Sequence, residues 1–528
     1  MPLPNARTLA DKNFHNAMQN VDHTRHHICV IGGGAAGAQF YKESVRRSID
    51  ANLVDVVSYI MVDNRPSSDL GRGVAWNGEQ SDLLLANMRI NTMLPPDLLQ
   101  ELVGISEAQA DSLSDRALFR QRKEVGELFH KDFNRQKELG ITKGIPFLHI
   151  QSNCIAIYEL GMGYIVAVES GHQYFVHDIV LALGHNPSSQ YHHLRGTPGF
   201  YMNPWDWNIY SEIDQKSRVG VIGLGPTAID AILSLNERGI SPISAYSRDG
   251  LLQYPRPRSE TYTPRYMTEA YITELYNEIG LTFSQVVNLI YQEYEVAGVP
   301  CSSLRIGLQK VAKLSPLEAL LEGLKSVEVS QPWFGILKSF DDVTQLIWHL
   351  LPDAGKEEYL QEWRKSHTTV SYGMASLQAR RVADLLQDRH IYLKKGITSI
   401  EKNSPSGFVV NYANAKGEAA NDALDIIINC SGIGTDITKS DNALINFLHN
   451  HQVLIPHPRG GAMVDFYSGQ LLNEEKLPQG QVYSLVGSLT YGTHLLTHCL
   501  GQVSKSAKRT AQAIHKKLNE RYQRRPED

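Results

Sequence analysis

The chain has 528 residues, and its balance of 42% hydrophobic and 20% charged residues is typical of a folded protein of roughly two to four domains. The formal net charge of −5 provides no global basic field that would attract nucleic acid, so we expect no nucleic-acid partner. The five cysteines show no CxxC spacing, which argues against a zinc ribbon or redox dithiol and favours buried thiols in a reducing cytoplasm. No apolar run reaches the ~18 residues of a membrane span, so we expect a cytoplasmic protein without a membrane partner.

The first organised segment follows a polar stretch, residues 1–25, which lacks the apolar core of a signal peptide and which we interpret as a flexible arm. The run HICVI at 27–31 predicts a buried parallel strand. Gly32, Gly34 and Gly37 then form the pattern GxGxxG. In such a pattern the first glycine allows a tight turn, the second a close approach to a pyrophosphate, and the third close helix packing. We therefore predict a dinucleotide-binding turn, with a purely structural glycine turn as the alternative.

A carboxylate at the end of the next strand is expected to complete this unit, because it accepts hydrogen bonds from ribose hydroxyls. VVSYIMVD at 56–63 supplies the strand and ends at Asp63. Asp63 follows Gly37 by 26 residues, which is longer than usual. The intervening helix or its exit loop is therefore expected to be extended.

The same strand, glycine turn and helix recur later in the chain. The strand RVGVIG leads into Gly223, Gly225 and Ala228, which form the accepted variant GxGxxA. The next strand ends in Ser247 and Arg248 instead of an acid. A hydroxyl and a guanidinium bind a 2′-phosphate that a carboxylate would repel, so this turn predicts NADPH, unless Arg248 is only a solvated surface cation. The two turns together predict a permanently bound FAD and an NADPH that binds transiently and reduces the FAD by donating a hydride.

Three further apolar runs end in glycine, which lets the backbone pack closely against a flat ligand. They are FVHDIVLALGHNP (175–187), ALDIIINCSGIG (423–434) and the segment 481–514. We expect the first as a strand where the chain leaves the FAD-binding domain and the second as a strand of the same type. The third is expected to form a strand, a turn at Gly487 and a long helix.

Residues 265–390 show helical periodicity with polar faces, which predicts a helical insertion. Two roles stay open: a cover that shapes the substrate pocket, or a contact in a homodimer. The predicted fold is α/β, with two Rossmann-like domains for FAD and NADPH and this insertion. Its predicted parts are the arm 1–25, the FAD-binding domain 26–214 and 423–520, the NADPH-binding domain 215–264 and 391–422, and the insertion 265–390.

Several short segments occur in an order and spacing that resemble FAD/NAD(P)-binding proteins, in the branch that includes flavin-dependent N-hydroxylating monooxygenases. They are DLGRGVAW (69–76), LLLANM (83–88), LALGHNP (181–187), NPWDW (203–207), SRDGLL (247–252), NCSG (429–432) and LVGSLTYGT (485–493). The resemblance spans roughly residues 25–520. The chain lacks a clear FxGxxxH signature of Baeyer–Villiger and dimethylaniline-type monooxygenases, and HDIVLALG only approximates the DxxxATG pattern of ornithine and lysine hydroxylases.

The resemblance implies roles for individual residues of this chain. The ADP part of FAD is assigned to Gly32, Gly34, Gly37 and Asp63. The pyrophosphate and isoalloxazine are assigned to Arg72, Gly73 and Asn87, and a late segment that returns to the flavin to Gly487 and Thr490. The NADPH half is assigned to Gly223, Gly225, Ala228, Ser247 and Arg248.

The resemblance further implies a monooxygenase that uses FAD, NADPH and O₂ through a flavin C4a-hydroperoxide. The expected substrate is an amino acid or other small amine of secondary metabolism, oxidised at nitrogen. The flavin carries this chemistry, so no catalytic side chain is assigned. Two alternatives stay open: an NADPH-dependent flavin reductase or dehydrogenase without oxygen insertion, and a non-catalytic protein that uses the FAD fold as a scaffold.

Two other groups of residues are candidates for ligand contacts. Arg256, Arg258, Arg380 and Arg381 are candidates for binding a substrate carboxylate, with solvated surface cations as the alternative. His494 and His498 have the i, i+4 spacing of metal ligands, but no third ligand accompanies them. We therefore expect helix packing or flavin contact for these histidines, and no metal.

Overall fold

The computed structural model describes residues 22, 24–93, 99–100, 104–106, 109, 118–302, 314–403, 406–414, 416–478, 483–497 and 499–522. The chain divides into two compact units, each assembled from segments far apart in the sequence. The first unit comprises residues 1–78, 123–189 and 433–528, and the second comprises residues 79–122 and 190–432.

The first unit is built on five parallel strands in the order β18-β7-β1-β2-β3. The central strand β1 (His26–Ile31) is buried along its whole length. A parallel strand covered on both faces needs such a continuous apolar run, which is why HICVI forms it. The other strands are β2 (Val57–Val62), β3 (Phe147–Ile150), β7 (Asp178–Leu181) and β18 (Tyr483–Leu485).

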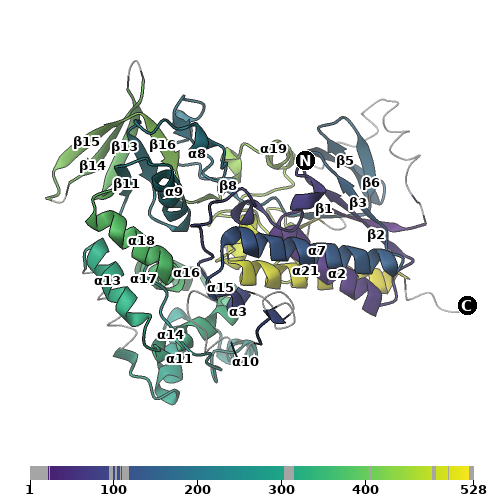
Figure 1. Cartoon of the computed structure of the whole chain (residues 1–528). Coiled ribbons are helices and arrows are strands. Elements are labelled where there is room, and N and C mark those ends of the chain that lie inside the picture. The colour runs from purple at the N-terminus through teal and green to yellow at the C-terminus, as the bar shows by residue number, and fades with distance from the viewer. Residues whose placement is uncertain are drawn as a thin grey trace, which may run out of the picture. The chain divides into compact units, whose positions relative to one another are not determined.

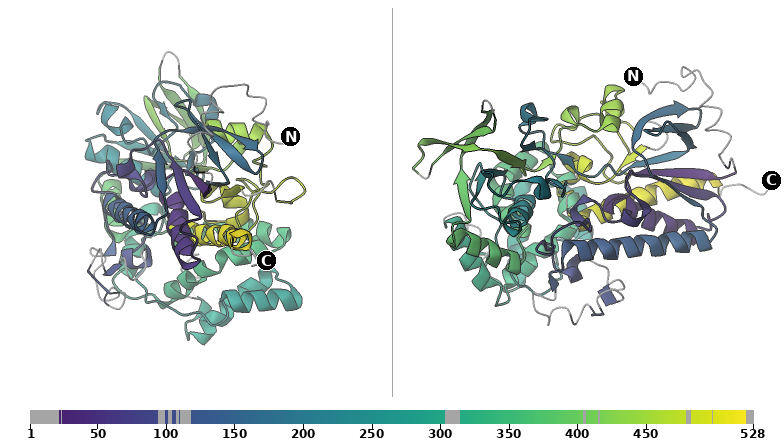
Figure 2. Two further views of the ribbon diagram at one scale, coloured as in Figure 1. Left: turned by 90° about the vertical axis from the view of Figure 1, so that its right-hand side faces the viewer. Right: turned by 45° about the horizontal axis from the view of Figure 1, so that its top comes forward.

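Helices cover one face of this sheet and an antiparallel three-stranded sheet covers the other (Figures 1 and 2). Successive side chains of β1 alternate between these layers: Ile28 and Val30 pack with the helices, and Cys29 and Ile31 pack on the opposite face. The helical layer contains α2 (Ala35–Asp50), α7 (Arg122–Thr142) and α21 (Leu500–Tyr522). The opposite layer contains β4 (Cys154–Leu160), β5 (Gly163–Val168), β6 (Gln173–Val176) and α19 (Ala443–Asn450).

Two expectations for this unit are resolved by its strand and helix bounds. The long spacing from Gly37 to Asp63 comes from α2, which has 16 residues, as expected for an extended helix. The stretch 175–187 is not one strand, because β6 ends at Val176 and β7 begins at Asp178. The unit also contains a two-stranded sheet of β8 (Asn186–Pro187) and β17 (Ile433–Gly434), and the short helix α20 (Tyr491–His494).

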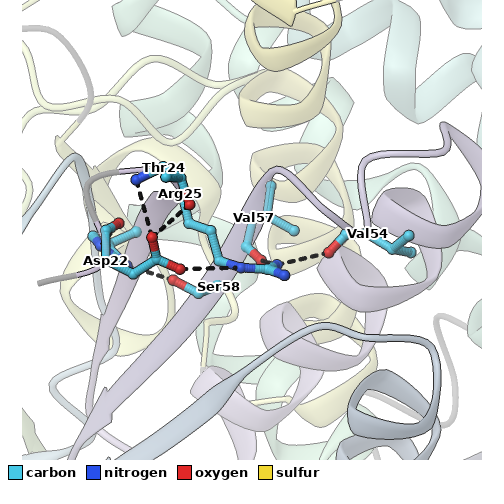
Figure 3. A network of polar contacts seen from close by, with 7 residues as sticks. Asp22, Thr24, Arg25, Val54, Val57 and Ser58 are labelled. Atoms are coloured by element: carbon cyan, nitrogen blue, oxygen red, sulfur yellow. Dashed lines mark hydrogen bonds and ion pairs between the residues drawn. The ribbon is translucent and has the colours of Figure 1, made fainter.

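The described residues just before β1 make polar contacts with one another and with the sheet (Figure 3). Arg25 donates from Nη1 to the carbonyl oxygens of Val54 (2.9 Å) and Val57 (3.1 Å), next to the start of β2. Asp22 accepts a hydrogen bond from the backbone N–H of Thr24 at 3.0 Å. Backbone carbonyls of the sheet unit therefore hold the arginine side chain, and flexibility of the arm as a whole stays a prediction. The rest of the arm lies outside the described residues.

The second unit has its own sheet of five parallel strands, in the order β12-β11-β10-β16-β9. All four residues of the central strand β10 (Val219–Ile222) are buried. Helix α9 (Pro226–Glu237) follows the glycine turn after β10 and shares a core with the sheet. The other strands are β9 (Phe200–Tyr201), β11 (Ile243–Ser247), β12 (Ile391–Lys395) and β16 (Ile426–Asn429).

The strand β16 corrects the predicted domain boundaries. It was expected to open the second part of the FAD-binding domain at residue 423, but it pairs with β10, with Ile426 opposite Val219. An apolar run that ends in glycine fits either parallel sheet, so the sequence alone could not assign this strand. Residues 79–122 and 190–214 were also expected in the FAD-binding domain and belong to the second unit.

The described residues between β11 and β12 are largely helical, as predicted for the insertion. Two of these helices, α13 (Pro316–Ser326) and α18 (Ser376–Gln387), contribute Leu324 and Val382 to the core of the parallel sheet. The remaining helices are α10 (Glu269–Ile279), α11 (Phe283–Val296), α14 (Pro332–Ser339), α15 (Thr344–Leu350), α16 (Asp353–Glu358) and α17 (Arg364–Ser371). Whether the insertion covers a substrate pocket or forms a dimer contact stays a prediction.

A buried carboxylate organises the loop that leads into the insertion. Glu293 of α11 is fully buried and accepts backbone N–H bonds from Arg265 (2.5 Å), Tyr266 (2.8 Å) and Met267 (3.2 Å). The hydroxyl of Tyr262 donates to the same carboxylate at 2.9 Å. Because a buried carboxylate is costly unless its lone pairs are satisfied, this residue holds the loop in one conformation.

The second unit is completed by an antiparallel sheet and short helices. The antiparallel strands are β13 (Ile397–Lys402), β14 (Phe408–Ala413) and β15 (Ala419–Leu424), and the short helices are α3 (Ile90–Met93) and α8 (Ile209–Glu212). Among the described residues of the whole chain, no helix is long and apolar enough to cross a membrane.

Candidate functional site

The first glycine turn connects β1 to α2 and fits the roles predicted for its outer glycines. Gly32 has a φ of 105°, and a Cβ there would lie 2.1 Å from the carbonyl oxygen of Ala182. A Cβ on Gly37 would lie 2.0 Å from the carbonyl oxygen of Gly32. Both positions exclude any side chain, so β1, β7 and α2 can only pack this closely with glycine at these two places.

The middle glycine stands in a different environment, at the N-terminus of α2. Gly34 is extended (φ −73°), and no side chain caps the helix at this residue. A Cβ on Gly34 would lie 3.5 Å from both an Nη of Arg65 and the Cα of Gly73. Gly73 has a φ of 81°, and a Cβ there would lie 3.4 Å from the backbone N of Ala35. The uncapped N–H groups of α2, a guanidinium and two glycines therefore meet at one place, which suits an anion such as a pyrophosphate.

Asp63 lies directly after β2, as predicted, but its carboxylate is already engaged. Its oxygens accept hydrogen bonds from the backbone of Gly33 (2.6 Å) and from the backbone N, Nε and Nη2 of Arg65 (2.9, 2.9 and 2.8 Å). Four bonds fill the acceptor sites of a carboxylate. Burial raises the pKa of Asp63, but the bonds and charge of Arg65 outweigh burial and bring that pKa below its usual value. In this arrangement Asp63 orients Arg65 and keeps no lone pair for a ribose hydroxyl.

Three other predicted residues lie around the same turn. Gly487 has a φ of 93°, and a Cβ there would lie 3.5 Å from the Cβ of Ala36 in α2. Thr490 is fully buried and donates to the carbonyl of Gly487 at 2.9 Å, so its hydroxyl stabilises the turn after β18. Arg72 forms an ion pair with Glu127 of α7 (2.5 Å).

The second glycine turn repeats this geometry between β10 and α9. Gly223 has a φ of 114°, and a Cβ there would lie 2.2 Å from the carbonyl oxygen of Cys430, just as Gly32 meets Ala182. Ala228 is completely buried at the position that corresponds to Gly37. Gly225 is extended, and a Cβ there would meet nothing within 4 Å. The space beside Gly225 is therefore open, as a site for a pyrophosphate requires.

Ser247 and Arg248 lie at the carboxyl end of β11, where the sequence places a 2′-phosphate site. The Ser247 Oγ accepts the backbone N–H of Gly250 at 2.8 Å, which leaves its hydroxyl proton free to donate. Arg248 is exposed. Burial raises the pKa of Tyr191, and the positive charge of Arg248 opposes that rise, which places Tyr191 near the guanidinium.

Asn87 and Arg256 are brought together by the structure, although the sequence assigned them to different ligands. Asn87 belongs to the second unit, and its carbonyl accepts a hydrogen bond from Arg256 Nη1 at 3.2 Å. Arg256 also donates to the carbonyl of Ser371 at 3.3 Å and is only 4% exposed. The guanidinium of Arg256 is therefore buried and bound to backbone carbonyls, and its candidate role in binding a substrate carboxylate stays a prediction.

The other candidate arginines differ in exposure. Arg380 is exposed and pairs with Glu328 at 3.5 Å, and Arg381 donates to the carbonyl of Leu83 at 3.2 Å. Arg258 is exposed. A role in substrate binding stays a prediction for these three residues.

The histidine pair on the late segment cannot be assessed as a pair, because His498 lies outside the described residues. His494 is fully buried, and its Nε2 lies 2.9 Å from the carbonyl oxygen of Phe466, which fits the predicted packing role. No group of His, Cys, Asp and Glu within the part of the chain that the structure describes has the arrangement of a metal site.

Sequence reasoning missed Arg65, which the structure places beside the middle glycine of the first turn. Its only signal in the sequence is its position two residues after the acid that ends β2. Such a position does not reveal that the side chain folds back onto Asp63. The contact depends on the turn after β2, whose path the sequence does not specify.

Comparisons with known proteins concern the fold and the first glycine turn. Residues 29–186, which contain this turn, match a family model described as FAD-NAD(P)-binding. No curated protein sequence matches the chain.

Solved structures share the fold over nearly the whole chain. An ornithine hydroxylase from Pseudomonas aeruginosa has a TM-score of 0.54 at 12% identity, covering 94% of this chain and 100% of that chain. An L-lysine 6-monooxygenase from Pseudomonas syringae has a TM-score of 0.55 at 14% identity, covering 93% and 99%. An ornithine N-hydroxylase from Kutzneria sp. 744, solved with reduced FAD, NADP⁺ and L-ornithine, has a TM-score of 0.52 at 13% identity, covering 94% and 100%. The predicted α/β fold with two parallel-sheet units is thereby confirmed.

Proposed function

We propose that the protein is an FAD- and NADPH-dependent monooxygenase that hydroxylates the nitrogen of an amino acid or another small amine. The observation that carries the proposal is the presence of two separate glycine turns, each between a parallel strand and an uncapped helix N-terminus. One such turn suffices for a protein that binds a single nucleotide. Two turns fit an oxidoreductase in which a visiting cofactor reduces a resident one.

In this proposal the first unit holds FAD through its phosphates. The uncapped N–H groups at the start of α2 donate to pyrophosphate oxygens, and the helix dipole favours their negative charge. Arg65, oriented by Asp63, directs its remaining N–H donors to the same anion. Gly34 and Gly73 keep side chains away from this space.

The second unit holds NADPH in the equivalent way. Pro226 occupies the first position of α9, so Thr227 and Ala228 supply the first free N–H groups beside Gly225. Ser247 donates its hydroxyl proton, and Arg248 its guanidinium protons, to the 2′-phosphate. These two residues would make the site selective for NADPH over NADH.

Bound FAD supplies the redox chemistry, by accepting a hydride from NADPH and activating O₂ for transfer of one oxygen atom to the substrate. The protein must then bind and orient both nucleotides and exclude water from the flavin. Support for an amine as substrate comes from the fold shared with ornithine and lysine hydroxylases. Arg258, Arg380 and Arg381 remain candidates for contact with a substrate carboxylate.

The test is product analysis of aerobic reactions with NADPH. The flavin-loaded protein is incubated with ornithine, lysine, cadaverine and a panel of other primary amines, and hydroxylamine product, hydrogen peroxide and consumed NADPH are quantified. The proposal predicts that one amine gives a hydroxylamine in nearly equal amount to the NADPH used. Peroxide without organic product for every amine would favour the reductase alternative. A chain that does not bind FAD would favour the non-catalytic scaffold.

A further inference from the structure

The carboxyl end of β12 carries a second cation beside the residues proposed to bind the 2′-phosphate. β12 pairs in parallel with β11, and its last residue, Lys395, lies opposite Ser247 in the register. Paired residues of neighbouring parallel strands project to the same face of the sheet, and such strands lie about 4.8 Å apart. The side chains of Lys395 and Ser247 therefore project from the same face of the sheet, each at the carboxyl end of its strand.

Backbone contacts fix Lys395 next to the turn that carries Arg248. The backbone N–H of Gly396 donates to the carbonyl of Arg248 at 3.1 Å. A Cβ on Gly250 would lie 3.0 Å from the Cβ of Lys395. Because these contacts come from both ends of the turn after β11, the position of Lys395 relative to Arg248 is set by backbone geometry rather than by flexible side chains.

The surrounding charges leave these two cations available to an anion. Lys395 and Arg248 are both exposed, and no ion pair among the described residues engages either of them. The nearby acids are already paired: Asp249 with Lys365 (3.1 Å), and Asp422 with Lys394. Two unpaired cations and a hydroxyl donor at one sheet edge match a dianionic phosphate monoester better than a neutral ribose hydroxyl.

We propose that Lys395 is a specificity-determining residue that binds the 2′-phosphate of NADPH together with Ser247 and Arg248. The inference rests on the proposed function, because it assumes that the second turn holds a nicotinamide dinucleotide. It adds a contact from β12, which neither the glycine motif nor the residues after β11 reveal. The two cations hold the phosphate from adjacent strands, so neither alone provides the full selectivity.

The test compares NADP⁺ and NAD⁺ binding to the flavin-loaded, full-length protein by isothermal titration calorimetry. The variants are Lys395→Gln, Lys395→Arg and a matched control, Lys402→Gln, which removes an exposed lysine at the end of β13 in the same unit. Lys395→Gln should weaken NADP⁺ binding about five- to tenfold and leave NAD⁺ binding within about twofold. Lys395→Arg should restore most of the loss, and Lys402→Gln should change neither ligand.

The salt dependence gives a second readout. NADP⁺ affinity of the unmodified protein should fall more steeply with added KCl than that of Lys395→Gln, since one charge contact has been removed. Unchanged NADP⁺ affinity in Lys395→Gln, while the unmodified protein prefers NADP⁺, would overturn the role of Lys395 and leave the proposed function intact. An equal loss for both ligands would also overturn it. Equal binding of NADP⁺ and NAD⁺ by the unmodified protein would overturn both this role and NADPH as the preferred cofactor.

Discussion

The substitution Gly225→Ala separates a ligand-binding role of the second turn from a structural one. Gly225 has an ordinary extended conformation (φ −79°), and an added Cβ would meet no protein atom within 4 Å. Alanine is a poorer N-cap than glycine by roughly 0.5–1 kcal/mol. The reduced freedom of the unfolded chain offsets this by about 0.4–1 kcal/mol. The free energy of unfolding should therefore change by no more than about 0.5 kcal/mol.

Binding of NADPH should respond very differently. The new methyl group would occupy the space through which a phosphate reaches the N–H groups at the start of α9. Loss of one charge-assisted hydrogen bond costs about 1.5–3 kcal/mol, which corresponds to a roughly 10- to 100-fold weaker affinity. Gly37→Ala in the first turn provides the contrast, since its Cβ would lie 2.0 Å from the carbonyl oxygen of Gly32 and must disturb packing.

The assay combines urea unfolding with calorimetric titration of NADPH. The expected pattern for Gly225→Ala is native stability with weakened NADPH binding, whereas Gly37→Ala should lose stability and flavin together. Native NADPH affinity in Gly225→Ala would refute the assignment of this turn to the nucleotide. A large loss of stability in Gly225→Ala would show that this glycine is required for folding.

Three further substitutions test the polar interactions of the two units. Arg65→Gln removes two of the four hydrogen bonds to the carboxylate of Asp63, whose side chain is 8% exposed, whereas that of Arg65 is 25% exposed. We expect the free energy of unfolding in urea to fall by about 2–3 kcal/mol and FAD binding, measured by fluorescence titration, to weaken. Unchanged FAD binding would contradict the phosphate role of Arg65. Glu293→Gln should destabilise the second unit by about 2–4 kcal/mol and increase proteolysis at residues 265–267, because the amide cannot accept all the N–H bonds that hold this loop. Native protease resistance would show that the carboxylate of Glu293 does not hold the loop. Burial raises the pKa of Asp230 from 3.8 to about 6, although Arg122 lies 3.0 Å away. The native state therefore keeps a proton that the unfolded state releases between those values, and the stability from this site falls by roughly 3 kcal/mol as pH rises through 6. Asp230→Asn should accordingly gain this amount relative to the unmodified protein between pH 4 and pH 7, and a pH-independent difference would contradict the raised pKa.

Local patterns predicted the two glycine turns because each strand, turn and helix is continuous in sequence. The close packing at Gly37 is also local, since a Cβ there would meet Gly32. At Gly32 and Gly223 a Cβ would meet Ala182 and Cys430 on the neighbouring strands, so that packing depends on the tertiary fold. The apolar runs before these turns form the central strands β1 and β10, as expected for parallel sheets with two covered faces.

The errors concern contacts between distant segments. The run that forms β16 is equally suited to either sheet, and only its pairing with β10 assigns it to the second unit. The sequence also could not show that Arg256 is buried and donates to the carbonyls of Asn87 and Ser371, which are more than a hundred residues away in sequence. Side-chain partners of this kind depend on the tertiary fold, which a local pattern does not contain.

The proposed function requires that this chain hold FAD and accept electrons from NADPH. Both properties are tested by the visible spectrum of the flavin-loaded protein after anaerobic mixing with NADPH or with NADH. We expect the flavin absorbance to bleach much faster with NADPH. Failure to bind flavin, or flavin that stays oxidised with both nucleotides, would refute the proposed function.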